Sequence, residues 1–316
     1  MTETHVVMYH YVRPTPDRPP HGYYHLALED FRHQLDHFEE SYGFVDREAF
    51  VAALRGERDA PDGVVLTFDD TLVDHHEWVL PELRRRDLWG LFFVPTGPYV
   101  HGRVLLVHRI HSLVGSVPAA RLRRELEAVL DDDPSVLEGT NEVENAYGDQ
   151  SSGADVSEIK RLLNFVVTPD EVQGVLDELE RRLGEYDPPT VSEYYLPEPA
   201  FAEMANAGML FGAHSVSHPV LSRLNEGDQR NEVESAVAWL DDRVDDQPVS
   251  TFAYPYGGDD TFTDATVDAV AGAGCAAAFT TESGTVTDDD LRTTPFALPR
   301  RDCNEFEHGG ATFDLP

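Results

Sequence analysis

The feature of this sequence that most restricts its fold is the alternation of short apolar runs with stretches of helical periodicity. The apolar runs cover residues 6–9, 64–68, 91–94, 209–212, 250–253 and 276–279. Between the first two, Leu28, Phe31, Leu35, Phe38 and Tyr42 recur at the spacing of one helix face. Further helical patterns occupy residues 46–54, 77–88, 229–244 and 263–273. This order of elements predicts βα units and an α/β fold.

Residues 100–189 interrupt this rhythm. They contain helical patterns over 119–130, 156–167 and 171–183, and a polar, acidic segment over 131–155. The chain has 316 residues, of which 41% are hydrophobic, enough for one large core. We therefore expect a single domain over residues 1–316, with residues 100–189 as a helical insertion or cap within it.

The chain is strongly acidic, which limits its partners. It has 59 acidic against 24 basic residues, a formal net charge of −35, and Lys160 is its sole lysine. No basic stripe is available for nucleic acid or anionic lipid. This composition resembles that of halophilic proteins, because at ~1 M salt the Debye length falls to ~3 Å and self-repulsion is screened. An acidic protein from an ordinary cytoplasm is the alternative.

The ends and cysteines of the sequence bear on its location. Cys275 and Cys303 are far apart and outside any metal-binding spacing, so no disulfide framework is expected. Residues 5–9 are apolar over too short a distance for a signal peptide or a membrane span. We expect a cytoplasmic protein without membrane insertion.

Two adjacent carboxylates follow one of the apolar runs. Thr67-Phe68-Asp69-Asp70 places both aspartates at the carboxyl end of a predicted strand, where α/β folds carry their chemistry. Adjacent like charges disfavour ionisation unless a cation compensates them. An aspartate pair that only caps the next helix is the alternative.

A histidine pair follows another run. His214 and His218 are four residues apart, so in a helical turn they would face the same way. Two histidines and one aspartate give three ligands and an open position, as in catalytic metal sites. We expect Asp70, His214 and His218 to converge on one divalent ion, which can lower the pKa of its bound water to ~7.

The residues Tyr254-Pro255-Tyr256-Gly257 end a third run and predict a tight turn whose N–H groups can point inward. A βα turn with aromatic packing is the alternative. In order and spacing, the three motifs resemble the polysaccharide deacetylases with the NodB homology domain (carbohydrate esterase family 4). The resemblance covers residues 6–93 and 194–304. The residues Met8-Tyr9-His10-Tyr11 and Leu298-Pro299-Arg300 resemble a cytoplasmic-type branch with a long insertion.

The resemblance implies a distorted, incomplete (β/α) barrel and assigns roles to these positions. Asp69 would be the general base, and Asp70, His214 and His218 would hold a divalent metal ion such as zinc. The backbone N–H of Tyr256 would help hold the developing oxyanion.

The resemblance also implies a substrate and its contacts. The substrate would be a carbohydrate or another N-acetylated small molecule that loses its acetyl group by hydrolysis of a non-peptide C–N bond. His10, Tyr254 and Pro255 are expected to contact it. A cytoplasmic location favours a glycan precursor, and the insertion would select it.

The chain departs from the family pattern at three points. Thr71 replaces the glycine that usually follows the aspartate pair, and Ala253 replaces the arginine that begins the third motif. Arg300 is our candidate for the missing arginine beside Asp69. The late Leu-x-His motif that supplies a general acid is absent. His10 and His308 are candidates without supporting spacing, so the general acid stays open.

Two alternative functions compete with the deacetylase. A carbohydrate-binding protein that has lost activity on the same fold would explain the departures. A haloacid-dehalogenase-like phosphatase would use Asp70 as its second aspartate, but Phe68 then occupies the nucleophile position. We expect the remaining histidines near the motifs to be surface residues, not ligands: His75, His76, His101, His108 and His111. Of these, His108 and His111 are the exceptions to consider first, because they begin the insertion near the strand ends.

Overall fold

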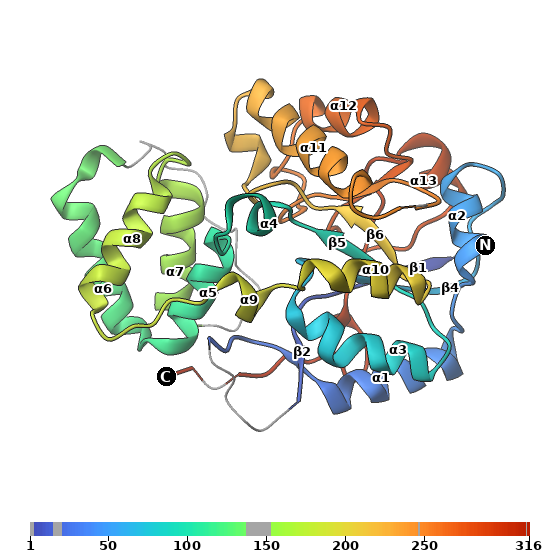
Figure 1. Cartoon of the computed structure of the whole chain (residues 1–316), viewed down its shortest axis with the longest axis horizontal. Helices are drawn as coiled ribbons and strands as arrows, with labels where there is room; N and C mark the ends of the chain where they lie inside the picture. Colours follow the sequence, from blue (N-terminus) through green and yellow to red (C-terminus); the bar gives the residue numbers. More distant parts are fainter. Residues whose placement is uncertain (1–2, 15–20, 137–152, 246, 314) are drawn as a thin grey trace. The chain divides into compact units, whose positions relative to one another are not determined.

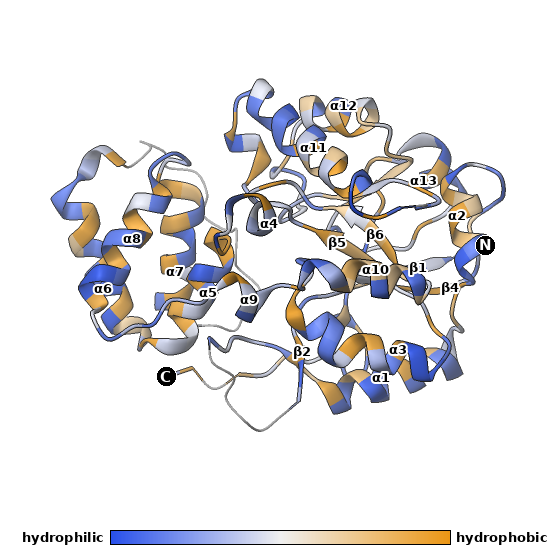
Figure 2. Ribbon diagram, viewed as in Figure 1, coloured by the Kyte–Doolittle hydropathy of each residue, from blue (hydrophilic) through white to orange (hydrophobic). Residues whose placement is uncertain are grey.

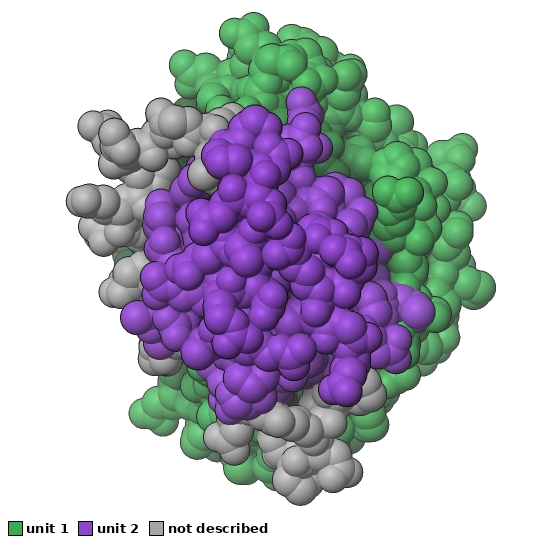
Figure 3. All heavy atoms as spheres, turned by 90° about the vertical axis from the view of Figure 1, so that its left-hand side faces the viewer, with its two compact units in different colours: residues 1–17, 24–103, 191–312 green, residues 18–23, 104–190, 313–316 purple. Residues whose placement is uncertain are grey.

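The computed structural model describes residues 3–14, 21–136, 153–245, 247–313 and 315–316. These residues form two compact units, one of residues 1–17, 24–103 and 191–312, the other of residues 18–23, 104–190 and 313–316. Figure 3 shows the first unit in green and the second in purple.

The first unit is built on a parallel sheet of seven strands that curls into a half-barrel (Figure 1). The strands are ordered β8-β7-β6-β5-β4-β1-β9 across it. Their bounds are β1 (Thr4–Tyr9), β4 (Gly63–Phe68), β5 (Leu91–Val94), β6 (Leu210–Ala213), β7 (Thr251–Ala253), β8 (Ala277–Phe279) and β9 (Arg301–Asp302). The predicted α/β class and incomplete barrel are therefore confirmed.

All six apolar runs are strands, and both of their faces are buried. Alternate residues contribute to two hydrophobic clusters, one containing Val64, Leu66 and Phe68, the other Val65 and Phe93. This explains why the runs are continuously apolar and do not alternate with polar residues. Figure 2 shows hydrophobic residues along β5 and β6. Because the strands are parallel, the motifs that follow them emerge at the same end of the sheet.

Residues 298–302 connect the two edges of the half-barrel. Leu298 forms a parallel bridge with Phe279 of β8, whereas Arg301 and Asp302 pair with β1 on the other edge. Arg300 lies between these two pairings. The sequence did not predict β9, because its two residues are charged and half-buried.

Helices flank the strands along the chain. A two-stranded sheet of β2 (Val12–Arg13) and β3 (Leu26–Ala27) precedes the first helix. The helices of the first unit are α1 (Leu28–Ser41), α2 (Arg47–Leu54), η1 (His75–Val79), α3 (Leu80–Arg85), α4 (Gly97–His101), α9 (Val191–Tyr194), α10 (Glu198–Asn206), η4 (Leu221–Arg223), α11 (Glu226–Asp241), α12 (Asp264–Gly272), α13 (Asp288–Thr293) and η5 (Cys303–Glu305).

The second unit is helical. Its elements are α5 (Leu106–Ser116), α6 (Ala119–Asp132), η2 (Pro134–Val136), α7 (Ala154–Arg161), η3 (Leu162–Val166) and α8 (Val172–Leu183). Residues 137–152, most of the predicted acidic segment, lie outside the described residues. That residues 100–189 cap the site stays a prediction. Among the described residues, no helix has the length and apolar character that a membrane span requires.

Candidate active site

Asp70, His214 and His218 converge at the carboxyl ends of β4 and β6. The Oδ1 atom of Asp70 lies 3.8 Å from Nε2 of His214 and 3.6 Å from Nε2 of His218. One potential ligand atom of each residue lies within 4.8 Å of the others, and all three side chains are buried. Two imidazole nitrogens and one carboxylate oxygen are the donors that Zn²⁺ and similar divalent ions accept.

A backbone hydrogen bond fixes the tautomer of His214. Its Nδ1 lies 2.7 Å from the carbonyl oxygen of Ala253, which can only accept, so Nδ1 carries the proton. The Nε2 lone pair is then directed toward Asp70, as a ligand requires. Burial lowers the pKa of His214, which favours this neutral form, although both neighbouring carboxylates oppose that effect. The residues present thus fit a divalent cation.

The two histidines are not on a helical turn, so the reason we gave for their convergence is wrong. Residues 214–218 form a loop in which Ser215 (φ 60°) and His218 (φ 56°) adopt left-handed backbone conformations. The N–H of His218 donates to Oγ of Ser215 (3.0 Å) and closes the loop. Two left-handed residues bring the imidazoles together, with ring centroids 4.8 Å apart.

Glu232 of α11 holds this loop from outside the motif. One of its carboxylate oxygens accepts hydrogen bonds from the backbone N–H groups of Val216 and Ser217, each at 2.8 Å. The other accepts from the hydroxyl of Ser217 at 2.7 Å. Sequence reasoning missed Glu232, since nothing distinguishes it among 59 acidic residues.

Arg300 lies beside Asp69 in a buried, bidentate ion pair. Its two terminal nitrogens donate to the two oxygens of Asp69 at 2.7 and 2.8 Å, and its Nε donates to the carbonyl of Thr280 at 2.9 Å. Asp69 is 2% exposed and Arg300 fully buried. Burial is the largest single influence and raises the pKa of Asp69, but Arg300, together with His214 and His10, brings that pKa below its ordinary value. The position of Arg300 follows from residues 298–302 linking both sheet edges.

His10, directly after β1, is the more exposed neighbour of Asp69. Its Nε2 lies 3.9 Å from Oδ2 of Asp69, and its side chain is 40% exposed. The carbonyl of His10 accepts a hydrogen bond from Nε2 of His75 at 2.8 Å. His75 and His108 are fully buried, so the expectation that they are surface residues is wrong. His75 packs against Phe68, and burial lowers its pKa to about 4.

The turn after β7 brings Tyr256 to the histidine pair. Its ring centroid lies 5.1 Å from that of His218, and its backbone is left-handed (φ 63°). Pro255 is buried, and so is Tyr254, whose hydroxyl donates to the carbonyl of Phe296 at 2.9 Å. The ring of Tyr254 also stacks on Phe262 with centroids 4.0 Å apart. The hydroxyl and the ring of Tyr254 thus both make contacts within the protein.

Left-handed backbone is concentrated at this site. Eight non-glycine residues of the described part have positive φ, and five of them are Asp70, Thr71, Ser215, His218 and Tyr256. Thr71 is a β-branched residue at φ 43°, a conformation that its side chain disfavours. Such strain persists only where surrounding contacts impose it, as functional sites do. His308, the second candidate acid, instead lies with Asp30 and His33.

A model of the polysaccharide deacetylase family matches residues 181–278, which include both histidines and the Tyr254 turn but not Asp69, Asp70 or Arg300. None of the curated proteins matches the chain in sequence.

Several solved structures share the fold at low sequence identity. The Streptococcus pyogenes deacetylase PplD in complex with acetate aligns with a TM-score of 0.56 and 18% identity, covering 95% of this chain and 92% of that chain. IcaB from Ammonifex degensii gives 0.55 and 18%, with the same coverage. The BpsB deacetylase domain from Bordetella bronchiseptica gives 0.53 and 14%, covering 95% of each. The chain thus shares the fold of these structures, and its residues 181–278 match the model of the polysaccharide deacetylase family.

Proposed function

We propose that this chain is a metal-dependent deacetylase that hydrolyses the N-acetyl group of a sugar within a glycan or glycan precursor. The observation that carries the proposal is the buried ion pair of Asp69 and Arg300 beside the donors of Asp70, His214 and His218. An ionised base and an adjacent set of metal ligands are the two parts that metal-assisted hydrolysis of an amide uses.

We assign the metal position to Asp70, His214 and His218, and zinc is the ion that best suits their donors. When bound, such an ion acts as a Lewis acid that polarises the acetyl carbonyl and acidifies water. His214 contributes Nε2 because its Nδ1 is committed to the carbonyl of Ala253.

Asp69 accepts the proton of the attacking water in this proposal. The guanidinium of Arg300 keeps the Asp69 carboxylate ionised and fixes its orientation through two hydrogen bonds. Arg300 is thus a positioning residue that acts through the base. Arg300 provides the positive charge beside Asp69 that Ala253, at the first position of the third motif, cannot provide.

The remaining steps concern the oxyanion and the leaving nitrogen. We propose that the backbone N–H of Tyr256 donates to the developing oxyanion, since its turn lies against His218. His10 is our candidate for donating a proton to the amine as the C–N bond breaks. Its Nε2 lies 3.9 Å from Asp69, and its partial exposure leaves room for a substrate.

The two alternatives lose support on specific residues. The inactive carbohydrate-binding protein was favoured by the missing arginine, but Arg300 pairs with Asp69 in its place. The phosphatase would need a nucleophile at Phe68, which is instead fully buried and stacked on Phe92 with centroids 4.7 Å apart. A cytoplasmic location, adaptation to molar salt and substrate selection by residues 100–189 remain parts of the proposal.

The test combines metal content with acetate release from a panel of N-acetylated sugars and short glycans. Purified protein should contain a divalent ion and release acetate, and removal of the ion by a chelator should abolish release. The matched variant Asp70→Asn should lose both the ion and the activity. A protein that releases acetate equally well after complete chelation would contradict the proposal.

A further inference from the structure

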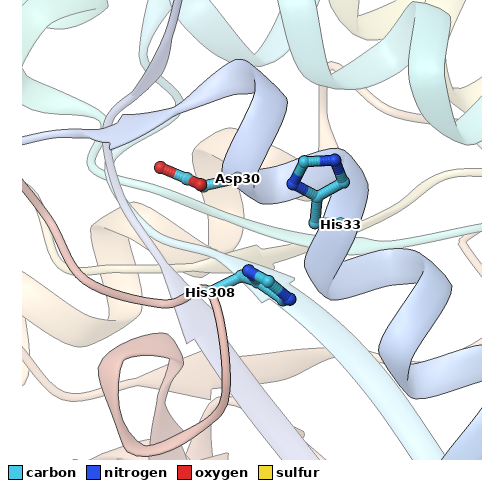
Figure 4. Close-up of side chains that lie close together, drawn as sticks. All are labelled: Asp30, His33 and His308. Carbon is cyan, nitrogen blue, oxygen red and sulfur yellow. The ribbon is translucent and has the colours of Figure 1, made fainter.

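A second Asp–His–His cluster lies on the surface of the first unit, formed by Asp30, His33 and His308 (Figure 4). One potential ligand atom of each residue lies within 4.8 Å of the others. Asp30 and His33 are three residues apart on α1, so their side chains share a helix face. The ring centroids of His33 and His308 are 5.2 Å apart.

A buried glutamine fixes His308 against α1. The Nε2 of Gln34, which is fully buried, donates to the carbonyls of Cys303 (2.9 Å) and Glu307 (3.0 Å). The Oε1 of Gln34 accepts from the hydroxyl of Tyr9 on β1. The residue before His308 is therefore tied to α1 next to His33.

The backbone around His308 is constrained as well. His308 itself is left-handed, at φ 64°. A Cβ at Gly309 would lie 1.7 Å from the carbonyl oxygen of Cys303, so only glycine allows this close approach. The position of His308 is thus held by the backbone and Gln34, while its side chain remains exposed.

The charges around the cluster suit a cation. The Nε2 of His33 lies 3.7 Å from a carboxylate oxygen of Glu29, and Glu307 precedes His308. The whole chain carries a net charge of −35, which concentrates cations at its surface. Two imidazoles with one carboxylate favour borderline transition metals over Mg²⁺ or Ca²⁺, which prefer oxygen donors.

We propose that Asp30, His33 and His308 form a second, solvent-exposed site for a divalent transition metal of the zinc type. This inference goes beyond the proposed function, because the site involves none of the residues assigned to hydrolysis. A bound ion would tie the segment after β9 to α1, and water would complete its coordination.

The test is the number of Zn²⁺ ions bound per chain, titrated in molar KCl with excess Mg²⁺. The Mg²⁺ occupies sites made of carboxylates alone, so they do not contribute to the count. Wild type should bind two ions, and His33→Gln and His308→Gln should each bind one with acetate release unchanged. Asp70→Asn should also bind one. His37→Gln, on the same helix but outside the cluster, is the matched control and should bind two.

The outcomes separate this site from the proposed active site. If wild type binds one ion, and Asp70→Asn loses that ion while His33→Gln keeps it, the surface site is overturned. One ion that His33→Gln loses and Asp70→Asn keeps would support the surface site and count against the proposed function. Equal loss of the second ion in His37→Gln would overturn the assignment to these three residues.

Discussion

The two Asp–His–His clusters of the first unit offer the same donor atoms in different surroundings. Asp70 and His214 are 4% and 2% exposed, whereas His33 and His308 are exposed. The buried cluster (Asp70, His214 and His218) lies beside Asp69 and the Tyr256 turn. The surface cluster (Asp30, His33 and His308) has Glu29 for a neighbour. The donor atoms decide which ion binds, whereas burial and the neighbouring residues decide whether a bound ion can take part in a reaction.

Burial gives the two clusters different chemistry. Charges removed from water interact more strongly, so a base and an ion within the buried cluster can act on one another. At the surface, water and salt screen the same interactions. We therefore expect catalysis at the buried cluster and only binding at the surface cluster.

The largest effect is expected from Asp69→Asn, which removes the base from the buried cluster and leaves its three donors in place. Acetate release should fall by about 10²–10⁴-fold, the usual contribution of a general base. The bound ion should remain, because Asp70, His214 and His218 are unchanged. Metal content and acetate release are measured on the same preparation, in molar salt so that self-repulsion does not unfold the protein.

The control is Asp70→Asn, which should lose the ion first and activity as a consequence. If Asp69→Asn keeps activity within a few-fold of wild type, or loses its ion as readily as Asp70→Asn, the two aspartates do not divide the work. The buried cluster would then differ from the surface cluster in burial alone.

Removing the guanidinium beside Asp69 should have the next largest effect. Arg300→Met leaves a buried carboxylate without its ion-pair partner, which costs about 3–5 kcal/mol of unfolding free energy. Arg301→Met is the matched control, because Arg301 is 34% exposed and lies 3.8 Å from Glu305. Its loss should cost about 0–1 kcal/mol. Equal losses in chemical unfolding would show that burial of the Asp69 pair has no special weight.

Glu232→Gln tests how the histidine loop is held. A glutamine carries no charge, so the hydrogen bonds from the backbone N–H groups of Val216 and Ser217 lose their charge assistance, and the hydroxyl of Ser217 loses its carboxylate acceptor. We expect affinity at the buried cluster to fall by about 10–100-fold, as for other groups that orient ligands. Glu234→Gln, an exposed position on the same helix, should leave it unchanged, and neither variant should affect the surface cluster. Unchanged zinc affinity in Glu232→Gln would remove Glu232 from the site.

The strands and their motifs were predictable because each depends on local sequence. The six apolar runs are all strands, and their parallel arrangement brings Asp69, Asp70 and His214 to one end of the sheet. The expected proximity of Arg300 and Asp69 is observed as well. It could be anticipated because the family resemblance calls for an arginine beside the base, Ala253 cannot provide it, and a base beside a second carboxylate needs a cation.

The contacts that depend on tertiary structure could not be predicted. Glu232 reaches the histidine loop from α11, and Gln34 of α1 binds the carbonyls of Cys303 and Glu307 across more than 260 residues. Neither residue belongs to a motif. The left-handed conformations of Ser215 and His218 also had no signal, because neither residue is a glycine. Four-residue spacing suggested a helical turn, and a strained loop achieves the same convergence.

The smallest effect separates the clusters in the absence of any ion. In chelated protein, His33→Gln should change the unfolding free energy by no more than about 0.5 kcal/mol, as surface substitutions usually do. His214→Gln should cost about 1–3 kcal/mol, because the buried carbonyl of Ala253 loses a well-placed donor. Adding Zn²⁺ should then stabilise His33→Gln less than wild type, since a ligand that binds only the folded state adds stability at each site it occupies. Denaturant unfolding with and without Zn²⁺ measures both quantities. If His33→Gln is as costly as His214→Gln before zinc is added, the surface cluster is held by protein contacts and not arranged for an ion.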